Sequence, residues 1–250
     1  RVENCSVNYK AKYVGAIAGY ASVVVALENS EIKNVKLNGA EYVGGAVGLA
    51  EGKTAIKSVS VEGSIIKGVS EISGIAAGRE NASVADARVS SSEILTIADT
   101  AAFFAGGISS SFCSSINSVE VRDTTIKAGV ASAIVGKAAM DAKLSIKGAN
   151  VCRTTVRAES ANSVAAGILA VYNAGGAVVI SEGYVDSETT IISTSVASGI
   201  VGDITGAESA LVAENIKSFA IVETVSSADA VAAAGAVAKL SGAALNNVQF

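Results

Sequence analysis

The sequence contains no proline, no histidine and no tryptophan, and only 4% of its 250 residues are aromatic. A chain of this length would carry about 12 prolines at the usual frequency of ~5%. Because proline lacks a backbone N–H, its absence predicts a backbone in which nearly every N–H is needed by a hydrogen-bonded ladder. Without histidine, the chain cannot form a Ser–His triad or a histidine metal site.

Cysteine is also scarce, since only Cys5, Cys113 and Cys152 are present, far apart and odd in number. This pattern is neither a disulfide framework nor a zinc site, so we expect the three cysteines to serve as small buried apolar residues. The sequence contains no uninterrupted apolar run of 18 residues, so it predicts no membrane span. Segment 228–245 is rich in alanine and broken by glycine, so a local helix stays an alternative there.

The net charge is −4 and the charges are scattered singly. The sequence therefore contains no basic stripe and predicts no nucleic-acid partner. Half of the residues are apolar, and Val, Ile, Ala and Leu supply most of them. The chain also contains 25 glycines. The chain begins Arg-Val-Glu without a methionine or a signal peptide, which indicates a processed product or a fragment.

An internal repeat dominates the chain. The first pattern is an apolar residue, two others, an apolar or small residue, one other, and an apolar residue. Its nine copies start 24 to 36 residues apart, at Val2, Ile32, Ile56, Val84, Ile116, Ile146, Ile180, Ile216 and Leu245. A second, glycine-containing pattern alternates with the first, and its eight copies start at Val14, Val43, Ile72, Phe104, Ala133, Ala166, Ser198 and Ala234.

A third feature is another apolar residue about five positions after the first pattern, at Ile66, Ile94, Ile126, Val156 and Ile191. Thr125, Thr155 and Thr190 directly precede three of these residues.

These short, β-branched, alternating segments favour strands over helices, and units of this size bury a core only by stacking. We therefore predict an all-β fold, a single-domain parallel β-helix of about eight or nine rungs that spans residues 1–250. Like residues would then lie ~4.8 Å apart in columns, with Val59 over Val35 and Val61 over Leu37. Glycine would serve where the coil bends sharply or two backbones approach closely.

The segments "VENCSV", "YVGGAVG" and "SGIAAG" resemble the GLUG-motif repeats of bacterial surface and adhesin-like proteins. Those repeats pair an "I-x-N-C/V-x-V" strand with a "V-G-G-L-V-G" strand. The resemblance is good in residues 1–78 and weaker afterwards, where glycine pairs shrink to single Gly or Ala. It implies a parallel β-helix in a large secreted or surface protein, and it assigns no functional residue.

Chemistry-bearing residues do not converge in the sequence. The aspartates fall at different positions of the repeat, namely Asp86, Asp99, Asp123, Asp141, Asp186, Asp203 and Asp229. The sequence contains no Asp-x-Asp run, so it does not indicate a calcium loop. We therefore assign no catalytic, cofactor-binding or metal-binding residue, expect no cofactor, and expect that the chain is not an enzyme.

Two residue groups carry alternative hypotheses. Arg122, Asp123, Arg153, Arg157 and Glu159 fall on neighbouring rungs, and we interpret them as an exposed cross-rung ion ladder of little individual strength. The threonines at positions 125, 155 and 190 either reflect strand propensity on an outer face or form an ice-facing or ligand-facing ladder.

The functional expectation is an extracellular or cell-surface stalk or filament segment that displays adhesive faces. The alternative is a polysaccharide-binding or polysaccharide-degrading module, and a third hypothesis is ice binding. No cap is visible at either end of the repeat, so we expect a window of a longer rod or rods stacked end to end. Expected partners are further repeats or copies of the same protein, and glycans or proteins of a host or cell surface.

Overall fold

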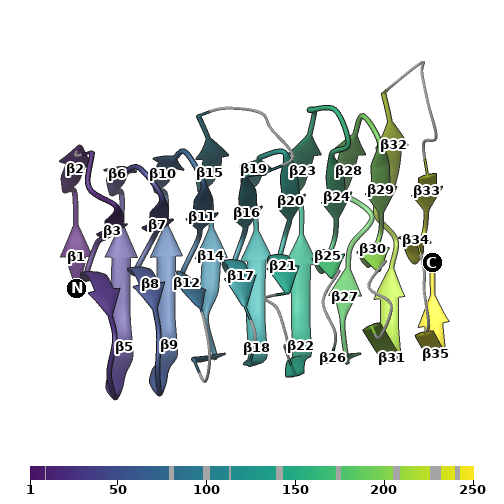
Figure 1. The fold of residues 1–250 in the computed structure, drawn as a ribbon, viewed down its shortest axis with the longest axis horizontal. Helices are drawn as coiled ribbons and strands as arrows, with labels where there is room; N and C mark the ends of the chain where they lie inside the picture. Colours follow the sequence, from purple (N-terminus) through teal and green to yellow (C-terminus); the bar gives the residue numbers. More distant parts are fainter. Residues whose placement is uncertain are drawn as a thin grey trace.

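The computed structural model describes residues 1–8, 10–78, 82–97, 102–112, 114–138, 143–172, 176–204, 209–225, 232–239 and 243–250. Within these ranges the chain forms strands and turns and no helix, and the strand pairs run parallel. Figure 1 shows the strands stacked side by side along one axis, with the two termini at opposite ends of the rod. The predicted all-β parallel β-helix is confirmed.

Each turn of the coil passes through four faces, which we name A to D in chain order. Face A carries the longest strands: β1 (Val2–Glu3), β5 (Val25–Lys33), β9 (Thr54–Glu62), β13 (Ser83–Ala85), β14 (Arg88–Ser90), β18 (Ser115–Arg122), β22 (Lys143–Cys152), β26 (Gly176–Ser181), β27 (Tyr184–Val185), β31 (Ser209–Ser218) and β35 (Ala243–Gln249).

Face B is an eight-stranded sheet of β2 (Ser6–Asn8), β6 (Lys36–Asn38), β10 (Ile65–Gly68), β15 (Glu93–Thr96), β19 (Thr125–Lys127), β23 (Thr155–Ala158), β28 (Thr190–Ser193) and β32 (Ile221–Thr224). Face C is a second eight-stranded sheet of β3 (Tyr13–Gly15), β7 (Tyr42–Gly44), β11 (Glu71–Ser73), β16 (Phe104–Gly106), β20 (Val130–Ser132), β24 (Val164–Ala166), β29 (Val196–Ser198) and β33 (Ala232–Ala234).

Face D consists of a three-stranded and a five-stranded sheet that follow each other along the rod. Its strands are β4 (Ala18–Ala21), β8 (Val47–Ala50), β12 (Ala76–Gly78), β17 (Ser109–Phe112), β21 (Val135–Ala138), β25 (Leu169–Tyr172), β30 (Val201–Ile204) and β34 (Val237–Lys239). The glycine pattern of the sequence is therefore two short strands with a bend between them, whereas the resemblance implied one.

The register between turns differs from the predicted one. Val61 pairs with Ile32 and Val59 with Ser30, while Leu37 pairs with Ile66. The predicted stacking of Val61 on Leu37 and of Val59 on Val35 is therefore wrong.

The cause is that each turn contains the first pattern twice. The last residue of one copy is also the first residue of the next copy. The column that contains Val61 runs through Val2, Ile32, Val61, Val89, Val121, Val151 and Val185. The repeat is thus 28 to 34 residues long, narrower than the predicted range.

Two rows of left-handed residues mark the bends on either side of this column. One row has φ between 49° and 65° three positions before the column, at Asn29, Ser58, Asp86, Ser118, Gly148, Glu182, Asn215 and Asn247. The other has φ between 44° and 61° two positions after it, at Asn4, Asn34, Gly63, Ser91, Asp123 and Arg153. Asn, Asp and Gly tolerate this conformation best, so these bends help to set the register.

Buried hydroxyl groups line the bend from face A to face B, at Ser64, Ser92, Thr124, Thr154 and Thr189. The Oγ1 of Thr154 donates to the carbonyl of Cys152 at 2.9 Å, and the Oγ of Ser92 donates to the carbonyl of Ser90 at 2.8 Å. The backbone N–H of Ser64 in turn donates to Ser92 Oγ of the next turn at 3.1 Å. Each hydroxyl thereby satisfies backbone groups that the bend removes from the ladders.

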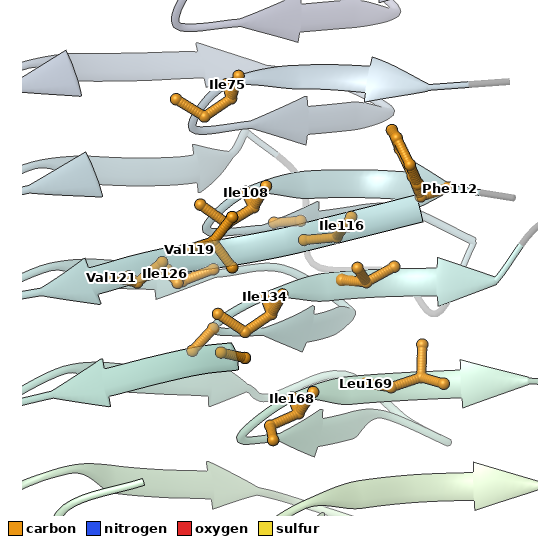
Figure 2. Packing of buried hydrophobic residues seen from close by; sticks show 14 of the residues in the cluster. Ile75, Ile108, Phe112, Ile116, Val119, Val121, Ile126, Ile134, Ile168 and Leu169 are labelled. Carbon is orange, nitrogen blue, oxygen red and sulfur yellow. The ribbon is translucent and has the colours of Figure 1, made fainter. Parts of the chain in front are cut away.

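The interior is a set of aliphatic columns. Figure 2 shows Ile75, Ile108, Ile134 and Ile168 repeating at the bend between faces C and D, and all four are fully buried. Burying one such side chain contributes roughly 1.5–3 kcal/mol, so repeated columns supply most of the stabilisation. The core contains few aromatic rings. In the described part of the chain, Phe112 and Tyr172 are the only aromatic residues that are fully buried.

The bend from face C to face D points into the coil and needs glycine. A Cβ on Gly74 would overlap the carbonyl oxygen of Gly107 and would press on Val89 of face A. Ala133 carries a Cβ in the same column, and its N–H lies 3.3 Å from the carbonyl oxygen of Ala166. The corresponding distance from the nitrogen of Gly107 is 3.1 Å. The predicted use of glycine at a tight backbone approach is therefore confirmed.

Segment 228–245 and the cysteines differ from what the sequence suggested. In segment 228–245 the described residues form β33, β34 and part of β35, so the helix alternative is wrong for them, while 228–231 and 240–242 lie outside the described residues. Cys5 and Cys152 are free and half-buried rather than buried, and Cys113 lies outside the described residues.

Candidate binding surface

Because the bend between faces C and D points inward, the outer sides of these two faces meet along a seam. Close backbone contact occurs within the seam, where a Cβ on Gly48 would strike the backbone of Val14. Towards its middle the seam is filled by Val130, Val164 and Val196, which are buried in a second apolar cluster outside the main core. The seam is thus a packed strip whose side chains change along the rod.

At the N-terminal end of the rod the seam is aromatic. The rings of Tyr13 and Tyr20 stack at 4.9 Å between centroids, and those of Tyr13 and Tyr42 at 5.4 Å. The second stack follows from the register, because Tyr13 pairs directly with Tyr42 on face C. Tyr20 lies on face D and is 45% exposed. We call these three residues the tyrosine cluster.

Charged side chains hold the edge of the tyrosine cluster. The hydroxyl of Tyr20 donates to the carboxylate of Glu51 at 2.5 Å, which raises the pKa of Tyr20 above its ordinary value. Lys12 lies 3.2 Å from Glu41 and 5.4 Å from the centroid of the Tyr13 ring. The hydrogen bond and charge of Glu41 raise the pKa of Lys12. The cluster therefore combines exposed aromatic surface with a rim of charged groups.

A pocket of about 430 Å³ opens beside Tyr13 at the same end of the rod. Ser6 and Asn8 supply polar groups to its wall, and Val7 and Val14 supply apolar surface. All of its lining residues belong to the first turn of the coil, and Val7, Ala11 and Val14 among them pack in or against the core, so the pocket is the uncovered side of that turn.

The predicted group of five charged residues divides into two sites. Arg153 forms a two-point contact with Asp123, at 2.7 Å and 2.8 Å, and Arg122 lies 3.3 Å from the same carboxylate. This contact lowers the pKa of Asp123, chiefly through the hydrogen bond from Arg153. Arg157 instead contacts Glu159 at 3.3 Å on face B. The ion ladder is exposed, since the side chains of Arg153 and Asp123 are 42% and 39% accessible.

The aspartates play separate structural parts. Asp186 accepts the backbone N–H of Arg153 at 3.1 Å, and Asp203 lies 3.7 Å from Lys239. Asp86 occupies one of the left-handed bends. Asp99, Asp141 and Asp229 lie outside the described residues. Within the described ranges no group of three or more Cys, Asp and Glu side chains could hold a metal ion.

The three threonines lie in one column on face B, because Thr125 pairs with Thr155 and Thr155 with Thr190. Glu93 precedes this column and Ile221 follows it. The threonines directly before them, at 124, 154 and 189, point inward and belong to the buried hydroxyl row. Ice binding stays a prediction, and thermal hysteresis of a concentrated solution tests it.

Glu71 and a run of serines form a polar section of the seam that the sequence patterns did not reveal. Ser110 and Ser111 both donate to the Glu71 carboxylate, and Ser110 also exchanges hydrogen bonds with Ser73. Ser110 is fully buried. A serine beside a carboxylate would need a poised base to act as a nucleophile, and the pairing here instead satisfies polar groups inside the seam.

The tyrosine cluster was also missed at the sequence level. Tyr13 and Tyr42 directly precede two copies of the glycine pattern, in "YVG", so their stacking follows once the register is known. Tyr20 belongs to the same cluster only because the bend folds face D back against face C.

Comparison with known proteins supports the fold. No protein-family model matches the chain, and no curated protein sequence matches it. The structure is similar to a crystal structure from Bacteroides ovatus that is provisionally named an immunoglobulin A1 protease, with a TM-score of 0.58 and 13% identity. The match covers 93% of this chain and 79% of that chain. At this identity the likeness shows the fold alone.

The structure adds one finding on membranes. Among the described residues no helix is long and apolar enough to cross a bilayer.

Proposed function

We propose that the chain is a structural segment of an extracellular or cell-surface protein, a rigid β-helical stalk or filament unit that displays adhesive faces and performs no catalysis. The observation that carries this proposal is the continuity of the ladders, since faces B and C each contain eight consecutive strands. Because neighbouring turns share both backbone hydrogen bonds and core columns, the rod resists bending and local opening.

The resemblance of residues 1–78 to GLUG-motif repeats supports the same function. The glycine pattern of those repeats coincides here with the strands β7 and β8 and the bend between them. A repeat that supplies scaffold and no catalytic group fits a role in display.

Surface labelling of intact source cells with an antibody against the chain tests the location. Labelling without permeabilisation is expected, and labelling only after lysis would contradict an extracellular segment. A turnover screen tests the absence of catalysis, with acidic polysaccharides and immunoglobulin A1, the substrate in the structural neighbour's name. Turnover by the purified chain that persists in independent preparations would overturn the structural function.

We also propose that further repeats or copies of this protein stack on the ends of the rod. The edge strands β1 and β35 each pair on one side only within the chain, with β5 and β31. Unpaired parallel edges are templates for another strand. Analytical ultracentrifugation tests this proposal: end-to-end stacking gives species that lengthen with concentration, and a monomer at all concentrations contradicts stacking by copies.

A second candidate function is polysaccharide binding, and the tyrosine cluster is the observation that favours it. Exposed tyrosine is an apolar surface with a hydroxyl at its tip, so it is common at binding sites for amphipathic partners. A glycan array with the purified chain tests this function.

A further inference from the structure

We propose that the tyrosine cluster, with Glu51 and the Lys12–Glu41 pair at its rim, binds a neutral oligosaccharide by stacking a sugar ring on Tyr20. This inference rests on the second candidate function and names the site and the class of ligand.

The first argument is the chemistry of the aromatic surface. Tyr20 is 45% exposed although one side of its ring contacts Tyr13 at 4.9 Å. The face of an aromatic ring carries negative electrostatic potential. The C–H bonds on one side of a pyranose ring point their positive ends outward, so they match that face. Val23 and Val24, the next large apolar residues along the chain, are 67% and 77% exposed.

The second argument is that the ring of Tyr20 is held in place. Its hydroxyl donates to Glu51, and its face is stacked on a tyrosine that is itself stacked on Tyr42. A side chain that is already ordered loses little conformational entropy when a ligand binds. The contacts of the cluster therefore favour binding on the exposed part of Tyr20.

The third argument concerns the rim. A carboxylate accepts several hydrogen bonds at once, so Glu51 and Glu41 can accept sugar hydroxyls in addition to their present donors. Lys12 supplies donors above the ring of Tyr13.

Charge selects the class of glycan. The rim carries Glu41 and Glu51 against Lys12, and the whole chain has a net charge of −4. Uronate-containing chains would meet like charge at this rim, so neutral glycans are the better match.

The test uses the whole chain with neutral hexasaccharides of the cello-, xylo- and β-1,3-gluco- series, and oligogalacturonate as the acidic comparison. Isothermal titration calorimetry gives the affinity, and tyrosine fluorescence gives a second readout, because the chain has no tryptophan. We expect a neutral series to bind more tightly than oligogalacturonate, and Tyr20→Ala to weaken that binding at least tenfold. Tyr20→Phe keeps the ring and should weaken binding only a few-fold.

Tyr184→Ala is the matched control, because Tyr184 is 40% exposed and also contacts another ring, that of Phe219. It should leave binding unchanged. Glycan binding that survives Tyr20→Ala within twofold would overturn this site and leave the second candidate function standing. Absence of binding to any glycan would overturn both. Should Tyr20→Ala fail to fold, Tyr20→Leu keeps the apolar bulk without the ring and gives the same comparison.

Discussion

The α-carbon of Gly74 lies so close to the carbonyl oxygen of Gly107 in the next turn that no Cβ fits between them. The contact recurs along the rod, because Gly45 lies in the same way under the carbonyl of Gly74. The inward bend between faces C and D therefore depends on backbone approach that only a small residue permits. This bend also creates the seam on the outside.

Gly74→Ala is the first variant to test this relationship. We expect a loss of about 1–3 kcal/mol in the free energy of unfolding, because the added Cβ forces two turns apart. For a chain of this size each kcal/mol lowers the Tm by about 2–4 °C. Ala133→Gly in the same column is the matched control, and its cost should stay below about 1 kcal/mol. Equal melting temperatures for Gly74→Ala and the parent chain would contradict the close approach.

Val59→Asp is expected to destabilise the coil severely. Val59 is 1% exposed, so the new carboxylate would be buried without a partner, at a cost of several kcal/mol. Ala55→Asp places the same group on the exposed side of the same strand and should change the Tm little. Thermal unfolding followed by circular dichroism compares the two. A Val59→Asp chain that melts like the parent would show that this side chain does not face the core.

The two adjacent threonines at 154 and 155 should respond differently to the same change. Thr154→Val removes the buried hydroxyl that donates to the carbonyl of Cys152, so we expect a loss of about 1 kcal/mol. Thr155→Val changes an outward side chain and should stay within about 0.5 kcal/mol. Denaturant unfolding measures both. A larger effect at Thr155 would indicate that its hydroxyl, rather than the buried one, stabilises the bend.

The ion pair of Asp123 and Arg153 predicts a pH-dependent contribution to stability. Contact with Arg153 holds the pKa of Asp123 below its ordinary value. A carboxylate with a lowered pKa in the folded state stabilises the fold at pH values above its unfolded pKa of about 3.9. That contribution disappears as the pH falls through the lower, folded pKa.

Asp123→Asn tests this contribution. The variant should melt slightly below the parent at pH 7, and the difference should shrink as the pH falls through the lowered pKa of folded Asp123. It should also shrink in high salt, because the pair is exposed. Glu159, which pairs with Arg157 at 3.3 Å and with Lys127 at 3.1 Å, is the comparison, through Glu159→Gln. A difference that grows as the pH falls would contradict the assigned direction of the pKa shift.

Much of the architecture is visible in the sequence. The alternation in "VKL", "VSV" and "VEV", repeated every 24 to 36 residues, predicts stacked parallel strands and aliphatic columns. The charged residues at 122, 123 and 153 were also expected to form a ladder across rungs, and the structure brings them together. These features follow from local pattern, because every turn repeats the same short-range choices.

The tyrosine cluster was not predicted, for a physical reason. Its members occupy two faces, and Tyr20 reaches Tyr13 only because the chain reverses direction between them. Patterns of apolar periodicity report which side of a strand is buried, and they say nothing about whether two outer faces meet.

The amino-acid sequence by itself determined that this chain is a coil of parallel strands with glycine at its tight bends. Only the tertiary structure decided which residues stack on which. By pattern alone, Val61 could stack on Ile32 or on Leu37 equally well. Ile32 begins a copy of the first pattern and Leu37 ends it. The choice of Ile32 depends on closing a full turn through the left-handed bends at Asn34 and Ser58, and that closure involves every residue of the turn.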